Sequence, residues 1–133
     1  MKLLECSANI SLIFYFFSVI IMASKAYEKG YRFERYIFRK LTESGFYCIS
    51  SRGSHGVFDI IAIFCGKIFG IQCKINGYLS KSELSKIHLI AHVHEIIPLL
   101  AYKHGRKTII KRLDMGETYP LKTFISHVLT EKI

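Results

Sequence analysis

The sequence is poor in acidic residues and has no paired-cysteine motif. Only ten Asp and Glu residues accompany nineteen Lys and Arg residues, so the formal net charge is +9 and the pI is about 9.5. An excess of this size favours an anionic partner, with a merely solubilising surface as the alternative. The cysteines show neither a C-x-x-C pair nor tight spacing, which argues against a zinc knuckle or a disulfide scaffold. We therefore expect a reducing, cytoplasmic location; the cysteines are Cys6, Cys48, Cys65 and Cys73.

The sequence also lacks the marks of a disordered or fibrous chain. Half of its 133 residues are hydrophobic and 22% are charged, and no internal repeat or low-complexity linker interrupts them. This length fits one domain with a buried core. No P-loop and no recognisable serine or cysteine hydrolase motif is present. The chemistry of this basic chain must therefore come from another set of residues.

The basic character lies outside the first part of the chain. No charged residue occurs in residues 6–24, and residues 10–22 are almost wholly apolar. The few residues before this run carry one lysine and one glutamate, so the net charge of residues 22–133 is still +9. We therefore divide the chain into an apolar leader over residues 1–21, a domain over residues 22–113 and a C-terminal extension over residues 114–133.

Three interpretations of the leader stay open. We favour a start codon that is assigned upstream of a true start at Met22. The second is a membrane anchor, because 19 uncharged residues are near the lower limit for a membrane-spanning helix. The cations that follow would then hold the domain in the cytoplasm. The third is a signal peptide or a buried helix, and a signal peptide fits less well because the positive charges follow the apolar run.

Hydrophobic periodicity predicts helices and strands in alternation. Apolar residues recur at helical spacing from Lys25 to Ser44, and Gly45 follows as a stop signal. Ser80 and Glu83 match a capping box that opens a second helix, which ends near His94. Strands are expected over Phe46–Ser50, Phe58–Phe64, Ile68–Ile75, Leu99–Lys103 and Thr108–Leu113, with a short appended helix over Leu121–Leu129. The predicted fold class is α/β, an αβββαββ core whose mixed central sheet is flanked by helices.

Three polar residues interrupt otherwise apolar strands. A two-residue turn at Gly66 and Lys67 would place Asp59 directly opposite Lys74, with Gln72 on the same face of the sheet. Burying a carboxylate and an ammonium costs several kcal/mol per ion before pairing, so we expect these residues to have a use. The alternative is a plain cross-strand ion pair between Asp59 and Lys74.

A fourth polar residue, Glu34, lies on or beside the apolar stripe with which the first predicted helix faces the sheet. It could complete a metal site with Asp59 and the amide carbonyl of Gln72. Oxygen ligands of this kind suit Mg²⁺ or Mn²⁺ and an incoming phosphate. The alternative for Glu34 is local pairing with Arg35 or another neighbouring cation.

A series of short motifs over residues 29–113 resembles, in order and spacing, the archaeal Holliday junction resolvases of the restriction-endonuclease-like, PD-(D/E)xK nuclease superfamily. The motifs are Gly30-x-x-x-Glu34-Arg35, Ser51-Arg52-Gly53-Ser54, Asp59-Ile60-Ile61-Ala62, Ile71-Gln72-Cys73-Lys74 and Pro98-Leu99-Leu100-Ala101-Tyr102-Lys103. The resemblance implies an αβββαββ core and a homodimer that cuts four-way DNA junctions with Mg²⁺ or Mn²⁺.

The resemblance also implies a role for each site residue. Glu34, Asp59 and Gln72 would be metal ligands, and Lys74 would orient or activate the attacking water. Contacts to the DNA backbone, which fix a protein on the duplex without reading its sequence, are expected from Lys25, Lys29, Arg32, Arg35, Arg52 and Ser54.

One position departs from the family pattern, because Gln72 replaces the second strand carboxylate. Its carbonyl can still coordinate a metal, but the site loses one negative charge. The alternatives to a junction-resolving enzyme are therefore a catalytically impaired DNA-binding module of the same fold, or another nuclease of the superfamily that acts on duplex or flap DNA. A membrane partner is expected only if the leader is part of the native protein.

Overall fold

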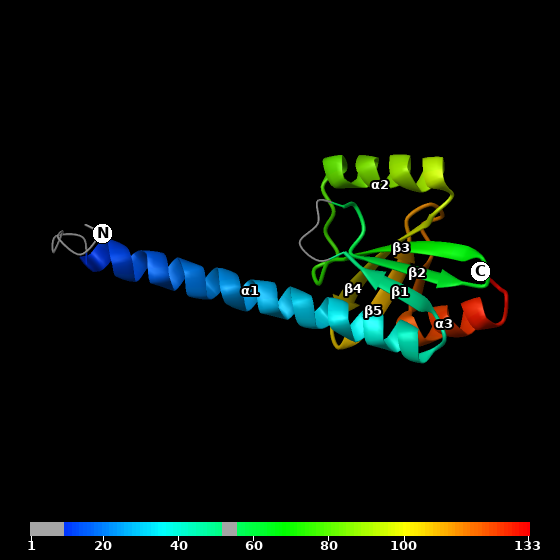
Figure 1. Ribbon diagram of the computed structural model, residues 1–133, viewed down its shortest axis with the longest axis horizontal. Helices are drawn as coiled ribbons and strands as arrows, with labels where there is room; N and C mark the ends of the chain where they lie inside the picture. The colour runs from blue at the N-terminus through cyan, green and yellow to red at the C-terminus, as the bar shows by residue number, and fades with distance from the viewer. Residues whose placement is uncertain (1–9, 52–55) are drawn as a thin grey trace. The chain divides into compact units, whose positions relative to one another are not determined.

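The computed structural model of the chain describes residues 10–51 and 56–133. The chain divides into two compact units, Met1–Arg32 and Phe33–Ile133, and the boundary falls inside the first helix. The described part of the first unit is a stretch of that helix, whereas the second contains the whole sheet and the remaining helices (Figure 1).

Helix α1 spans Ile10–Glu43 and therefore begins 15 residues before the predicted start at Lys25. The apolar run before Lys25 contains neither proline nor glycine, so nothing in it opposes helix formation. The predicted stop is confirmed. Gly45 adopts a φ of 99°, and Phe46 N–H donates to the carbonyl of Leu41 at 3.1 Å, as in a glycine-terminated helix.

Within the first unit, the large apolar side chains between Leu12 and Met22 are exposed. Among the described residues, α1 is the one helix that is long and apolar enough to cross a membrane. Signal sequences and the core helices of soluble proteins share that length and composition.

Six strands form one mixed sheet in the order β1-β2-β3-β4-β5-β6. Every neighbouring pair is antiparallel except β3 and β4, which are parallel because α2 connects them as a crossover. The elements of the second unit after α1 are β1 (Tyr47–Ser50), β2 (Ile60–Phe64), β3 (Lys67–Cys73), α2 (Lys81–His94), β4 (Ile97–His104), β5 (Lys107–Arg112), β6 (Thr118–Pro120) and α3 (Leu121–Leu129).

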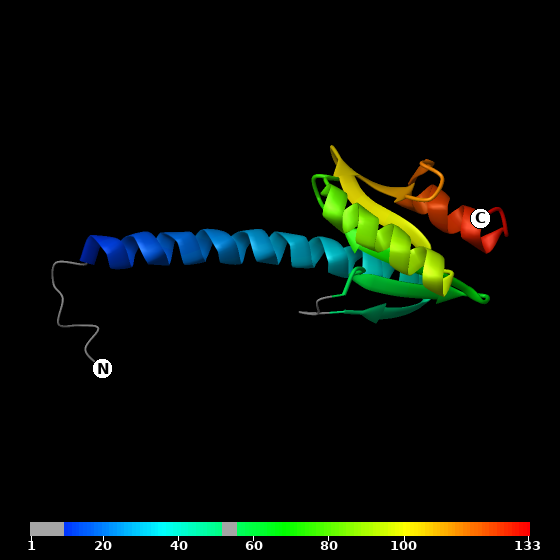
Figure 2. The same ribbon diagram turned by 90° about the horizontal axis from the view of Figure 1, so that it is seen from above.

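The helices of the second unit cover both faces of the sheet (Figures 1 and 2). The larger core lies between one face and the end of α1 together with α3, and it includes Ile37, Phe69 and Phe124. A smaller cluster holds α2 on the opposite face through Ile87 and Ala91. The predicted α/β class with a mixed, helix-covered sheet is therefore confirmed. The appended helix also occupies its predicted range.

The strand bounds also differ from the sequence-based expectation, because β2 begins at Ile60 and β3 ends at Cys73, each two residues inside the predicted range. Strand β4 begins at Ile97, two residues before its predicted start, because Pro98 pairs in parallel with Gly70 inside the strand. Strand β6 is absent from the prediction, since its three residues are too few for a recognisable alternation and it forms by pairing with β5.

The predicted turn between β2 and β3 is wrong by one residue. Its two loop residues are Cys65 and Gly66, with φ values of 47° and 80°, as a type I′ hairpin turn requires. The observed ladder pairs Ile60 with Ile71 and ends there, and the Asp59 N–H donates to the carbonyl of Ile71, so the predicted pairing of Asp59 with Lys74 is not formed. A shift of two positions leaves each side chain of β3 on its predicted face, because strands alternate with a period of two.

Candidate active site

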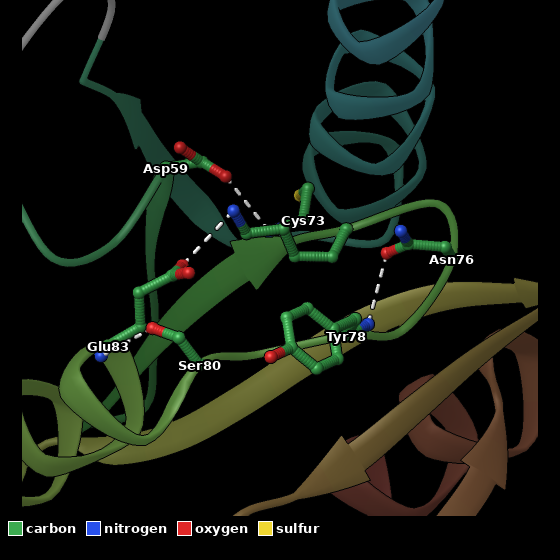
Figure 3. A network of polar contacts seen from close by, with 7 residues as sticks. Asp59, Cys73, Asn76, Tyr78, Ser80 and Glu83 are labelled. Carbon is green, nitrogen blue, oxygen red and sulfur yellow. Dashed lines mark hydrogen bonds and ion pairs between the residues drawn. The ribbon is translucent and has the colours of Figure 1, made fainter.

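Asp59 and Lys74 flank the point where β2 begins and β3 ends, and Figure 3 shows the Asp59 side chain beside the end of β3. Asp59 immediately precedes β2, and its N–H donates to the carbonyl of Ile71 at 2.9 Å. Lys74 immediately follows β3, and its N–H donates to the carbonyl of Ala101 at 2.9 Å. Both side chains are therefore carried by backbone that hydrogen bonds fix to the sheet.

The carboxylate of Asp59 is partly buried and accepts a hydrogen bond at Oδ2 from the N–H of Cys73 at 2.9 Å. Burial raises the pKa of Asp59 above its ordinary value. The bond from Cys73 and the charge of Lys74 act in the opposite direction, and Glu83 adds to the rise. A desolvated carboxylate at the end of a sheet is a common feature of catalytic and metal-binding sites.

The ammonium of Lys74 pairs with Glu83 and not, as the alternative interpretation expected, with Asp59. The distance from Lys74 Nζ to Glu83 Oε2 is 3.1 Å, and both side chains are partly exposed. The hydrogen bond from Lys74 lowers the pKa of Glu83 below its ordinary value. In the sequence, Glu83 is recognisable only as a capping residue, so its position beside Lys74 is a feature that spacing along the chain did not reveal.

The capping signal itself is confirmed, and hydrogen bonding from Ser80 also helps to lower the pKa of the Glu83 carboxyl group. Ser80 is the N-cap of α2, and its hydroxyl accepts the N–H of Glu83 at 3.1 Å. The side chain of Glu83 reaches across to the end of β3. The first turn of α2 thus brings a carboxylate to the same sheet end as Asp59.

Gln72 lines a cavity of about 160 Å³ beneath the first turns of α2. Its Oε1 atom is buried, and no hydrogen-bond partner for it occurs among the described residues. An orphaned buried acceptor of this kind costs about 1 to 3 kcal/mol, so it calls for a role. The cavity is lined by Gly56, Val57, Gln72, Glu83, Lys86 and Ile87.

Glu34 projects from α1 and accepts a hydrogen bond at Oε1 from the hydroxyl of Ser50 on β1 at 2.9 Å. Burial raises the pKa of the Cys73 thiol far above its ordinary value, and the charges of Asp59 and Glu34 raise it further. The carboxylates of Asp59 and Glu34 therefore both lie close enough to the Cys73 thiol, at the end of β3, to affect its pKa.

A metal ion would have to be held by a mixed donor set. Within residues 10–51 and 56–133, no group of three or more His, Cys, Asp and Glu side chains is placed to hold a metal. Glu34, Asp59 and the amide of Gln72 offer two carboxylates and one carbonyl oxygen, which is the hard-oxygen chemistry that Mg²⁺ and Mn²⁺ prefer. The Oε1 of Gln72 is an acceptor with no donor among the described residues, and the residues that line its cavity include neither Glu34 nor Asp59.

The residues expected to contact DNA are spread over both units. Arg35 is exposed in the second unit, with its guanidinium 5.1 Å from the centre of the Phe38 ring. Lys25, Lys29 and Arg32 are exposed on the part of α1 that belongs to the first unit. Arg52 and Ser54 lie outside the described residues.

The arrangement of fold and site defines a class of protein. A mixed sheet covered by helices, with an aspartate before β2 and a lysine at the end of β3, has the architecture of the restriction-endonuclease-like nucleases. Residues 25–127 match the family of archaeal Holliday junction resolvases, Hjc. The chain belongs to this family.

A curated relative and a solved structure support the assignment. The chain is 36% identical over 81 residues to the crossover junction endodeoxyribonuclease Hjc of Methanocaldococcus jannaschii, a match that covers 58% of this chain and 60% of the relative. The structure of Hjc from Archaeoglobus fulgidus, a Holliday junction resolvase, superimposes with a TM-score of 0.56 at 26% identity, over 65% of this chain and 75% of that one.

Proposed function

We propose that this chain is a metal-dependent endonuclease that resolves four-way DNA junctions by paired phosphodiester hydrolysis. The observation that carries the proposal is the convergence of Asp59, Glu34 and Lys74 at the end of β3 in a chain of the Hjc family. The named activity of the relative from Methanocaldococcus jannaschii, a crossover junction endodeoxyribonuclease, supports the choice of substrate.

Each site residue has a distinct part in the proposed reaction. Glu34, Asp59 and the carbonyl of Gln72 would hold Mg²⁺, which when bound neutralises charge on the phosphate and lowers the pKa of a bound water. The Cys73 N–H keeps the Asp59 carboxylate oriented. The Lys74 ammonium would stabilise the charge that develops on the phosphate or orient the attacking water.

We further propose that the working unit is a cytoplasmic homodimer. Two cuts placed symmetrically across a junction require two active sites. The described residues of one chain form one candidate active site, so two chains would be needed. The net charge of +9 suits a partner whose backbone is a closely spaced row of phosphates.

The direct test is cleavage of a four-way junction that lacks mobile arms, with the full chain, Mg²⁺ or Mn²⁺, and a linear duplex as the control. We expect paired symmetric nicks in the junction. Asp59→Asn should reduce the cleavage rate at least about a hundredfold, because it removes a partly buried negative charge from the site, and should leave the junction Kd unchanged.

Two outcomes would overturn the proposal in different ways. Salt-sensitive binding of the junction without cleavage in any divalent metal would identify a DNA-binding module, which the missing charge at Gln72 makes the second candidate. Equal cleavage of duplex or flap DNA would identify a different nuclease specificity. Cleavage retained by Asp59→Asn would remove Asp59 from the mechanism.

A second prediction concerns the metal. Gln72→Glu keeps the side-chain length and adds a charged oxygen, so the Mg²⁺ concentration at half-maximal rate and the Mn²⁺ Kd measured by calorimetry should both fall. Asn76→Asp is the matched control, because it makes the same chemical change at an exposed residue whose Oδ1 accepts the N–H of Tyr78. Equal behaviour of the two variants would show that Gln72 is not a metal ligand.

A further inference from the structure

The contact between β3 and α2 adds a residue to the proposed machinery (Figure 3). Lys74 carries its ammonium on four rotatable carbons at the end of a strand, and an unrestrained lysine side chain of this kind samples many rotamers. Glu83 meets that ammonium at 3.1 Å from a different element. The lysine is therefore held at both ends, by the sheet through its backbone and by α2 through its charge.

The support behind Glu83 is rigid. The hydroxyl of Ser80 accepts the N–H of Glu83 at 3.1 Å, and the carbonyl of Ser80 accepts the N–H of Leu84 at 2.9 Å. One turn later, Ile87 is only 1% exposed and fixes the helix on the sheet. Glu83 thus projects from a capped and packed first turn.

The pair is poorly explained as a device for stability. The side chains of Lys74 and Glu83 are 34% and 40% exposed. Ion pairs with this degree of exposure stabilise a fold by about 0 to 1 kcal/mol. The position of the pair indicates its role better than its strength does. The charges of Lys74 and Glu83 both affect the pKa of the Asp59 carboxyl group, so the pair lies at the candidate site.

We propose that Glu83 is a positioning residue for Lys74, which holds the lysine ammonium at the end of β3 beside Asp59. The inference rests on the proposed function, since it assigns Glu83 a task in the same nuclease site. Glu83 acts through Lys74 and is not itself a catalytic residue. The first turn of α2 then serves the site through the link from Ser80 to Glu83 to Lys74.

The test compares Glu83→Ala with the parent in the full chain. Under single-turnover conditions the cleavage rate of a four-way junction should fall about 10- to 100-fold, the range expected when a catalytic group is misplaced by about 1 Å. The junction Kd and the midpoint of thermal unfolding should stay close to those of the parent. Glu95→Ala, which removes a carboxylate from the other end of α2, is the matched control and should cut like the parent.

A second readout is independent of cleavage. Lys74 should react several-fold faster with an amine-directed acylating reagent in Glu83→Ala than in the parent, as measured by mass spectrometry of the peptide that contains it, and Glu83→Gln should give an intermediate rate because it keeps an acceptor. Unchanged labelling and unchanged cleavage in Glu83→Ala would overturn the proposal. A parent chain that cuts no junction but shows the labelling difference would overturn the proposed function and leave the contact between Glu83 and Lys74 in place.

Discussion

At the scale of single residues, Asp59 shows how burial and function oppose each other. Burial raises the pKa of its carboxyl group, which means that the folded state disfavours the charged form relative to the unfolded chain. The bond from the Cys73 N–H and the charge of Lys74 offset only part of this effect. The folded protein therefore holds a carboxylate that costs free energy of folding at neutral pH.

The sign of the resulting pH dependence follows by linkage. Because the folded pKa is raised, protonation favours the folded state, and the contribution of Asp59 to stability improves as pH falls through that pKa. Asp59→Asn removes the charge and keeps an acceptor for the Cys73 N–H. We expect the variant to unfold a few degrees above the parent at neutral pH, with the gap closing toward about pH 4. Thermal unfolding followed by circular dichroism across this range measures it.

Asp114 supplies a control of opposite sign. The hydrogen bond from Arg112 lowers the pKa of Asp114, so its contribution to stability is present at neutral pH and is lost as pH falls through the lowered pKa. Asp114→Asn should therefore be less stable than the parent at neutral pH. An Asp59→Asn variant that is also less stable there would mean that the carboxylate contributes more through its contacts than it costs through burial.

The chemistry of individual residues also determined which members of the candidate site could be predicted from the sequence. Asp59, Gln72 and Lys74 were recognisable because polar residues are expensive inside apolar strands. Glu83 was not, because a glutamate three residues after a serine is fully explained by helix capping. Its contact with Lys74 depends on where α2 is placed over the sheet.

At the scale of the elements, the close packing of β3 against the segment before β2 places Asp59. A Cβ atom added at Gly70 would lie 2.7 Å from three carbons of the Phe58 ring, which is a distance that packed atoms do not tolerate. Phe58 is 6% exposed in the cluster beneath α2 and immediately precedes Asp59. The glycine therefore makes room for the Phe58 ring, which packs beneath α2 and holds the segment that carries Asp59.

This packing predicts the effect of Gly70→Ala. The methyl group must displace the Phe58 ring, so the free energy of unfolding should fall by about 1 to 3 kcal/mol, as measured by urea denaturation. Junction cleavage should fall as well because Asp59 moves with its neighbour. Adding Phe58→Leu should restore part of the stability by making space.

Gly30→Ala is the control for this prediction, because an added Cβ there meets no described atom within 4 Å. It replaces a glycine inside α1, which favours the helix by about 1 kcal/mol. If Gly70→Ala were as stable as the parent, the ring of Phe58 would have to be free to shift. The inference that the packing of Phe58 on Gly70 fixes the position of Asp59 would then be wrong.

Element positions followed from local chemistry in most cases. The Ser80 cap, the Gly45 stop and the helix at Leu121–Leu129 were all predictable, because capping and apolar periodicity act within a few residues. The hairpin turn was misplaced by one residue, since either Gly66-Lys67 or Cys65-Gly66 can close a two-residue loop. Only the observed pairing of β2 with β3, which ends with Phe64 opposite Lys67, shows that Cys65 and Gly66 form the turn.

At the scale of the whole molecule, the two units differ in how their residues are used. The second unit buries its apolar residues in two clusters on opposite faces of the sheet. The first unit exposes the large apolar side chains between Leu12 and Met22. The family match begins at Lys25, after this exposed run.

The amino-acid sequence by itself determined the basic character of the chain, the order of its main helices and strands, and the polar residues that mark the site. These properties depend on composition and on short-range periodicity. The tertiary structure decided that Lys74 pairs with Glu83, that Asp59 is bonded to Ile71 and Cys73, and that the Gln72 oxygen is buried without a described partner. Those outcomes depend on how α2 and β3 pack across a loop, and contacts between distant segments are fixed only when the chain is folded.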